Sequence, residues 1–219
     1  MTGDPENFSA RLREALDRPL ENWRNVYESF SPVDIETGEQ LARRIPPADG
    51  NARRAAVLVP LLLDPEGIEL VYTVRKGHLN DHAGQISFPG GSLEPGDDSL
   101  LNTALREAEE EIDLSRALVE VIGELEEMYI PPSNFRVSPY VGLLPHEAEF
   151  AIDPREVEEI FTAPLLDLLS PGNFQKVIWS RDGRDYEVPV FAVKGYEVWG
   201  ATAAMTAALL SRLGWRPPA

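Results

Sequence analysis

The sequence predicts an α/β/α sandwich in a chain of the α+β or α/β class, with helices on both faces of a mixed central sheet. Strand-like segments occur before and after two separate helical segments, which is typical of such a sheet. The 219 residues, 43% of them hydrophobic, suffice for one sizeable core. We therefore expect a main domain at residues 51–219, preceded by a helical extension at residues 1–50.

The extension contains one predicted helix and a connector. The stretch ENFSARLREALDRPLENW at residues 6–23 predicts the helix, and prolines mark the connector at residues 45–50. Three roles stay open for residues 1–50: a cap on the main domain, a contact between two copies of the chain in a homodimer, or a loose arm.

The main domain begins with two predicted strands and continues into a helix. Residues 55–63 form an apolar run typical of a buried strand, and residues 68–76 follow it after the turn DPEG. A helix then begins at Asp98 or Ser99. Its predicted apolar stripe consists of Leu101, Ala104, Leu105, Ala108 and Ile112.

The second half predicts further strands and two helices. Strand-like patterns occur at residues 117–130, 136–145 and 196–200, and a hairpin with the turn RDGRD joins residues 174–180 to 186–193. The stretch DPREVEEIFTAPLLDLL at residues 153–169 predicts a helix that is interrupted near Pro164. A last helix is expected at residues 201–214.

The composition excludes several classes of protein. The formal net charge of -17 argues against a nucleic-acid partner, because phosphate backbones would be repelled. No apolar run reaches the length of a membrane span, and no signal-like segment follows Met1, so we expect a cytoplasmic protein without a membrane partner. The chain has no cysteine, which excludes a thiolate zinc site. An anionic substrate would need an external cation, and carboxylates suit Mg²⁺ or Mn²⁺.

The predicted helix at residues 99–112 carries a cluster of acids. Glu107, Glu110 and Glu111 stand at i, i+3 and i+4, so their carboxylates gather on one face and repel one another. A bound cation would remove this repulsion, and Arg106 alone cannot neutralise the cluster. The alternative interpretation is a solvated acidic face.

A glycine pair precedes this helix and favours the metal interpretation. Gly90 and Gly91 follow Pro89 and permit a close approach of the backbone to a ligand. The carbonyl oxygen of Gly90 is a further candidate metal ligand, because hard cations prefer oxygen.

These residues resemble the Nudix box, which marks hydrolases of nucleoside diphosphates linked to another moiety and implies the α/β/α sandwich of that family. Gly91, an acid six positions later and the stretch REAEEEIDL carry the resemblance. The box has Glu where this chain has Asp97, its spacing to the arginine instead fits Asp98, and its second glycine is replaced by Asp113. Which of the first two acids takes the box role stays open.

The flanking sequence resembles Nudix proteins of the coenzyme A diphosphatase type. The match covers Thr73, Arg75, Gly84, Gln85 and the stretch FPGG at residues 88–91. It implies hydrolysis of the pyrophosphate bond of coenzyme A or its thioesters, giving 3',5'-ADP and a 4'-phosphopantetheine product. The alternatives are another substrate such as ADP-ribose or a dinucleotide, and a non-catalytic module that binds a nucleotide.

The resemblance implies a role for each candidate site residue. The expected metal ligands are Glu107, Glu110, Glu111 and Gly90, and the same glutamates with Arg106 are the catalytic candidates. A helix glutamate or an acid from a later loop would serve as the base. Contacts to the small-molecule substrate are expected from Arg75, Gln85, Gly91 and Glu156, and also from His82. Glu124 and Glu127 are further candidates for a metal ligand.

Overall fold

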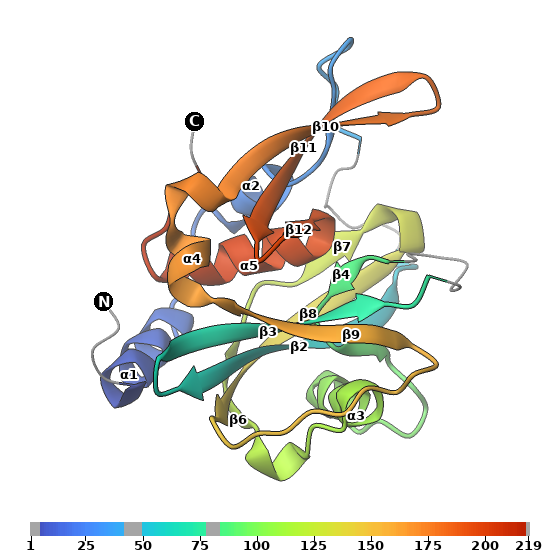
Figure 1. Ribbon diagram of the computed structural model, residues 1–219. Coiled ribbons are helices and arrows are strands. Elements are labelled where there is room, and N and C mark those ends of the chain that lie inside the picture. Colours follow the sequence, from blue (N-terminus) through green and yellow to red (C-terminus); the bar gives the residue numbers. More distant parts are fainter. Residues whose placement is uncertain (1–4, 42–49, 78–83, 218–219) are drawn as a thin grey trace.

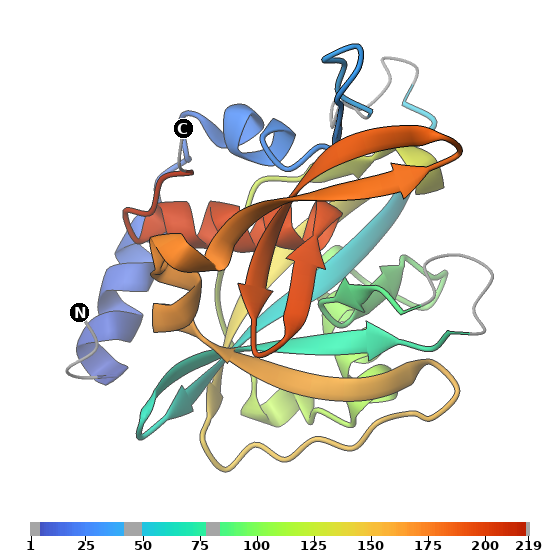
Figure 2. The ribbon, with the colours of Figure 1, turned by 45° about the horizontal axis from the view of Figure 1, so that its top comes forward.

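The computed structural model describes residues 5–41, 50–77 and 84–217 as stacked layers (Figure 1, Figure 2). Helix α3 (Leu100–Ile112) covers one face of a mixed sheet, and α5 (Gly200–Arg212) covers the other face. A second, smaller sheet lies beyond α5 (Figure 2). The predicted α/β/α sandwich is therefore confirmed, with one additional layer.

The larger sheet is built around a long parallel pair. Strands β2 (Arg53–Asp64) and β8 (Phe135–Pro145) run in parallel, whereas the other described pairs are antiparallel. The remaining strands of this sheet are β3 (Gly67–Arg75), β4 (Ile86–Ser87), β5 (Gly90–Ser92), β6 (Glu120–Glu124), β7 (Met128–Ile130) and β9 (Val157–Pro164).

The smaller sheet contains the predicted hairpin. Its strands are β1 (Val33–Asp34), β10 (Phe174–Arg181), β11 (Arg184–Val193) and β12 (Tyr196–Trp199). The hairpin turn places Asp182 and Gly183 at positive φ, which an Asp-Gly pair tolerates well. Short 3₁₀ helices occur at Arg116–Leu118, Pro131–Ser133 and Pro171–Asn173.

The predicted helix at residues 153–169 is wrong over most of its length. The chain forms a loop up to Glu156, then the strand β9, and only then the short helix α4 (Leu165–Leu169). The strand is antiparallel to β3, and Val157, Phe161 and Ala163 are its buried residues. Pairing with the sheet satisfies the backbone hydrogen bonds of this segment, so tertiary context overrides its local pattern.

The N-terminal segment packs against the main domain. The helix expected at residues 6–23 ends early, at Leu16 of α1 (Pro5–Leu16), and a second helix, α2 (Trp23–Glu28), begins only after Pro19. Both helices contribute to the large core that also contains α5, through Phe8, Leu12, Leu16, Val26 and Tyr27. Residues 5–41 thus pack on the rest of the chain, the role of this segment in a dimer contact stays a prediction, and most of the predicted connector at 45–50 lies outside the described residues.

Helix α5 is the apolar centre of the molecule. Nearly every residue of this helix is buried, including the small residues Ala203, Ala204, Ala207 and Ala208, so the layers on both sides approach it closely.

Within the described part of the chain, no helix combines the length and the apolar character that a membrane span requires.

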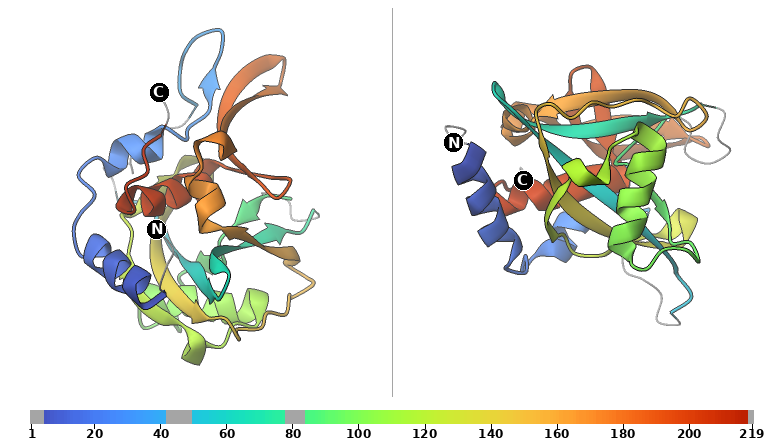
Figure 3. Two further views of the ribbon diagram at one scale, coloured as in Figure 1. Left: turned by 60° about the vertical axis from the view of Figure 1, so that its left-hand side comes forward. Right: turned by 90° about the horizontal axis from the view of Figure 1, so that it is seen from below.

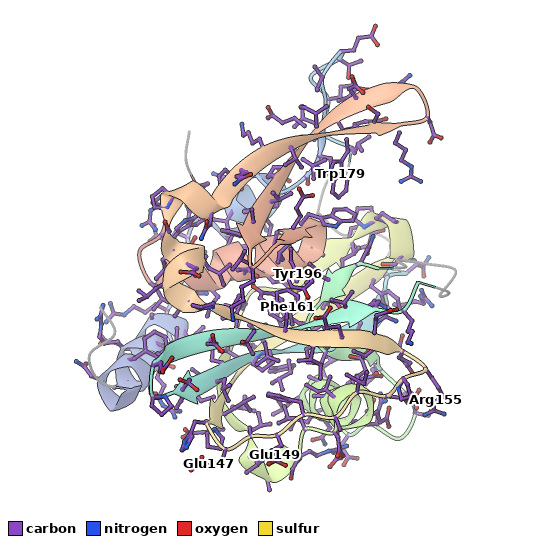
Figure 4. All side chains as sticks on the ribbon, viewed as in Figure 1. Glu147, Glu149, Arg155, Phe161, Trp179 and Tyr196 are labelled. Carbon is purple, nitrogen blue, oxygen red and sulfur yellow. The ribbon has the colours of Figure 1, made fainter. Side chains whose placement is uncertain are left out.

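Aromatic contacts join the two sheets beside α5. The rings of Phe161 on β9 and Tyr196 on β12 stack with centroids 3.9 Å apart, and both lie between the sheets in Figure 4. Phe161 also stacks on Tyr72 of β3, whose hydroxyl group is 3.0 Å from the hydroxyl oxygen of Thr206 on α5. The small sheet is therefore held to the large sheet by packing that includes a satisfied polar group.

A buried ion pair fastens the cap to the domain (Figure 3 shows α1 alongside α5). Arg212 at the end of α5 donates a 2.5 Å hydrogen bond to Glu126, and the two side chains are only 5% and 15% exposed. Arg212 also donates to the carbonyl oxygens of Ala15 and Arg18, and Glu126 accepts from the amide N–H of Leu20. One arginine and one glutamate thus satisfy several backbone groups of the cap.

We predict that Arg212→Met lowers the free energy of unfolding by about 3 kcal/mol, because it leaves the buried carboxylate of Glu126 without its counter-charge. Urea denaturation measures the loss. Arg13→Met is the matched control, since the Arg13–Glu120 pair is far more exposed and should contribute less than about 1 kcal/mol. Equal losses in the two variants would contradict the assigned role of Arg212.

Candidate active site

Helix α3 begins and ends with well-formed caps. Ser99, one of the two predicted first residues, accepts a hydrogen bond from the amide N–H of Asn102 at 3.2 Å. Asp113 ends the helix in the left-handed conformation, with φ of 54°, so an aspartate takes the place of the box glycine without disturbing the helix end. Among the predicted apolar stripe, Leu101 is not buried, and Leu100 takes its place against the sheet.

Arg106 connects the candidate residues to one another. Its Nη1 donates to Glu107 at 2.9 Å and to Glu110 at 3.0 Å, and its Nη2 donates to the carbonyl oxygen of Ser92 at 3.2 Å. On its other edge, Nε and Nη2 each lie 3.0 Å from an oxygen of Asp97. The guanidinium group therefore ties α3 to the loop before it through a bidentate pair.

The structure shows which of the two early acids contacts Arg106. Asp97 is the partner of Arg106, and it also accepts hydrogen bonds from the Thr103 hydroxyl and from the amide N–H of Glu94. The hydrogen bonds with Arg106 hold the pKa of Asp97 well below its usual range. Asp98 is exposed. Counting residues between the acid and Arg106 cannot distinguish Asp97 from Asp98, because the loop before α3 accommodates the one additional residue.

Glu107 occupies the space beside Gly91. A Cβ atom on Gly91 would lie 2.3 Å from Oε1 of Glu107, so no larger residue fits at this position with the glutamate in place. Burial raises the pKa of Glu107 above its ordinary value, and the Arg106 charge partly offsets that rise. Gly91 is therefore necessary for the position of a candidate ligand, and its predicted contact with substrate remains untested.

Glu111 is the buried carboxylate of the cluster. Its side chain is 4% exposed, Oε2 accepts a hydrogen bond from the Gly90 amide N–H at 3.1 Å, and Oε1 lies 3.4 Å from Nη1 of Arg75. Burial raises the pKa of Glu111 to about 7, although the charge of Arg75 and the Gly90 hydrogen bond act in the opposite direction. Glu110, by contrast, is largely exposed.

Arg75 and Glu156 approach this part of the site from two other segments, and Gln85 is paired with Arg75 through the backbone. The amide N–H of Arg75 donates to the carbonyl oxygen of Gln85 at 2.9 Å, which fixes the two residues side by side. Glu156 follows Arg155, which Figure 4 labels, in the loop before β9, and its carbonyl oxygen accepts from the Lys76 amide N–H. The charge of Glu156 contributes to the raised pKa of Glu107 and Glu111, so it lies within electrostatic range of both.

Other sequence candidates lie outside this cluster. Glu127 pairs with Arg54 and Arg136, and Glu124 acts electrostatically on Tyr140, so neither contacts the box glutamates in the structure. His82 lies outside the described residues.

The donor set of the cluster fits a hard divalent cation. Glu107, Glu110 and Glu111 supply carboxylate oxygens from one helix, and the raised pKa of Glu107 and Glu111 shows that their negative charge is undercompensated. Within the described ranges, no three acidic or histidine side chains form a ready metal-binding group, because Arg106 holds two of the glutamates. The ligand set, including the Gly90 carbonyl oxygen, remains a prediction.

Comparison with known proteins identifies close sequence relatives. Residues 52–181 match the family model described as the NUDIX domain. The chain is 40% identical over 153 residues to proteins named uncharacterized Nudix hydrolase NudL from Yersinia pestis (strain Pestoides F) and Yersinia pseudotuberculosis (serotype O:1b, strain IP 31758). These alignments cover 70% of this chain and 76% of each relative.

Comparison with solved structures supports the fold. The Nudix hydrolase RenU from M. smegmatis superposes with a TM-score of 0.54 at 13% identity, covering 80% of this chain and 97% of that one. A MutT/nudix family protein from Enterococcus faecalis gives a TM-score of 0.51 at 14% identity, covering 98% of this chain and 76% of that one. At such low identity the likeness concerns the fold alone.

We predict that Glu111→Gln stabilises the metal-free protein at neutral and higher pH. A pKa raised from 4.5 to about 7 means that the folded state binds the proton more tightly than the unfolded state does. The stabilising effect of the protonated carboxyl group is therefore complete below pH 4.5 and is lost as the pH rises to about 7, a difference of about 3 kcal/mol.

The measurement is Tm against pH in the presence of EDTA, for the native sequence, Glu111→Gln and the control Glu109→Gln. Glu109 is about half-exposed and pairs with Arg116, so its variant should follow the native curve. The Glu111→Gln curve should separate from the native curve above pH 4.5. Parallel curves for all three proteins would show that Glu111 is not an unfavourable buried charge.

Proposed function

This chain belongs to the Nudix hydrolase family and is a pyrophosphohydrolase, and from that premise we propose that its substrate is coenzyme A or a coenzyme A thioester. Water would cleave the pyrophosphate bond and release 3',5'-ADP and a 4'-phosphopantetheine product. The family acts on nucleoside diphosphate derivatives, so the new element of the proposal is the identity of the group linked to the diphosphate.

The observation that carries the proposal is the contact between the segment that carries the flanking motif and helix α3. The motif that resembles coenzyme A diphosphatases runs from Thr73 to Gly91, and its first residue is joined to the part just before FPGG because Thr73 hydrogen-bonds Ser87. The same segment brings Arg75 to within 3.4 Å of Glu111. A guanidinium group at this position suits the phosphate oxygens of a diphosphate.

The protein's own residues provide positioning and proton transfer. Arg106 fixes the directions of Glu107 and Glu110, and Gly91 leaves the space that Glu107 requires. Glu111, buried at the centre of the cluster, is one candidate to accept a proton from the attacking water. Glu156 is the alternative base, because it approaches the same carboxylates from a separate loop.

Nudix hydrolases generally use divalent metal ions, and we propose Mg²⁺ or Mn²⁺ here, held by Glu107, Glu110, Glu111 and the Gly90 carbonyl oxygen. Such an ion would add positive charge at the phosphates to that of Arg75. Oxygen ligands and a formal net charge of -17 support this choice over a softer metal. We also propose a cytoplasmic homodimer, which sedimentation at several concentrations would test.

The test of substrate identity is a panel assay. The protein is incubated with Mg²⁺ or Mn²⁺ and with coenzyme A, acetyl-coenzyme A, ADP-ribose, NADH and nucleoside triphosphates, and the products are identified by mass spectrometry. We expect 3',5'-ADP from the first two substrates. Preferred cleavage of ADP-ribose or NADH would replace our proposal with the alternative substrates, and no turnover by folded protein would favour the non-catalytic nucleotide-binding alternative.

We predict that Glu110→Gln or Glu111→Gln lowers kcat by at least about 100-fold, because each removes a carboxylate from the proposed cation site. The loss should occur without loss of the fold, as judged by circular dichroism. Glu109→Gln again serves as the control on the same helix. Near-normal turnover in both Glu110→Gln and Glu111→Gln would refute the assigned ligands.

Gly91→Ala should also abolish most activity, because the new Cβ atom would collide with the Glu107 carboxylate. Gly96→Ala is a suitable control, since nothing lies within 4 Å of a Cβ atom at that position. Steady-state kinetics with the substrate found in the panel assay would compare the variants. If Gly91→Ala retained the native kcat, then the contact between Gly91 and Glu107 would not be required for catalysis.

A further inference from the structure

Two arginines face the catalytic helix from neighbouring strands. Arg54 on β2 stands directly across from Arg136 on β8 in the parallel register of these strands. Ala56 and Leu58, at alternate positions after Arg54, pack in the same apolar cluster as the buried residues of α3. Because side chains alternate along a strand, Arg54 and Arg136 extend from this same face of the sheet.

This arginine pair lies beside the candidate active site. Ala56 pairs with Gly91, the residue whose close contact is the Glu107 carboxylate, and Arg54 is two residues, or about 7 Å, further along the strand. The carbonyl oxygen of Arg54 accepts from the Leu93 amide N–H, next to the Ser92 carbonyl group that binds Arg106. The backbone of Arg54 is therefore adjacent to the segment that precedes α3, and its side chain lies on the α3 side of the sheet.

The two arginines share one ion-pair partner. Both guanidinium groups approach the carboxylate of Glu127, at 3.5 Å from Arg54 and 3.9 Å from Arg136. Glu127 also accepts a hydrogen bond from Ser138 at 3.2 Å. A second carboxylate, that of Glu124, acts electrostatically on Tyr140 together with Arg54 and Glu127, and it forms no ion pair with either arginine in the described part of the chain. The side chains of the two arginines are 54% and 36% exposed, so they are accessible to a ligand.

We propose that Arg54 and Arg136 form a subsite for a phosphate monoester of the substrate that is not itself cleaved. This inference rests on the proposed function, under which that group is the 3'-phosphate of coenzyme A. The 3'-phosphate is attached to the same ribose as the scissile diphosphate, so it must bind close to the catalytic glutamates. A phosphate dianion matches two guanidinium groups better than a single carboxylate does, and it would displace Glu127 from them.

The test compares binding of the 3',5'-ADP product with binding of 5'-AMP, which lacks the 3'-phosphate. Isothermal titration with the full chain measures Kd for both nucleotides. We expect the native protein to prefer 3',5'-ADP, and Arg54→Gln and Arg136→Gln to weaken its binding about tenfold while changing the Kd of 5'-AMP by less than about twofold.

Two further variants separate a phosphate subsite from a structural role. Arg53→Gln is the matched control, because Arg53 faces the opposite side of β2, packs on the Phe135 ring and donates to the Ser133 carbonyl oxygen. It should bind both nucleotides as the native protein does. Glu127→Gln removes the competing carboxylate and should tighten 3',5'-ADP binding, whereas loss of a structural contact would weaken it or leave it unchanged.

The outcomes distinguish the subsite from the proposed function. The subsite proposal is overturned if the native protein does not prefer 3',5'-ADP, if the arginine variants affect both nucleotides equally or neither, or if Glu127→Gln fails to tighten binding. If the nucleotide preference follows the expected pattern but coenzyme A is not cleaved, then the subsite stands and the proposed substrate is wrong. If coenzyme A is cleaved but the native protein does not prefer 3',5'-ADP, then the proposed substrate stands and the subsite proposal is wrong.

Discussion

The position of the guanidinium group of Arg106 is the constraint on which the candidate active site depends. Its five N–H donors are divided among Asp97, Glu107, Glu110 and the Ser92 carbonyl oxygen. A lysine could not make these contacts at once, because its donors do not form a planar fork. The arginine therefore ties α3 to the preceding loop, and it holds two mutually repelling glutamates, Glu107 and Glu110, without making the cluster neutral.

The contacts of Arg106 can form because the backbone of β5 lies close to α3. Gly90 lies against Val57 of β2, and Gly91 lies against the Glu107 carboxylate, so the short strand β5 fits tightly between the sheet and α3. The buried stripe of α3 and the long parallel pair of β2 and β8 fix the two surfaces that enclose this strand. The packing of α3 on β2 and β8 thus determines the direction of the Glu107 carboxylate, because close-packed layers cannot shift independently of one another.

The sequence predicted those elements whose conformation depends on residues nearby in the chain. The cap at Ser99, one of two predicted positions, and the hairpin turn near Asp182 depend on neighbouring residues and were confirmed. The strand β9 was missed because its pairing with β3 lies far away in sequence. For the same reason, the sequence could name Glu111 and Arg75 as candidates but could not place them 3.4 Å apart. The juxtaposition of Arg54 and Arg136 likewise depends on the register between two distant strands.

The burial of Glu111 links the stability of the fold to its chemistry. An isolated carboxylate at this depth destabilises the folded state, and the Gly90 amide and Arg75 compensate only in part, as the raised pKa shows. To stabilise the ionised Glu111 without a bound ion, the chain would need a stronger positive charge beside it. That charge would then compete with a cation for the carboxylate. The undercompensated carboxylate is therefore consistent with a site that reaches its favourable electrostatic state only when positive charge comes from outside the chain.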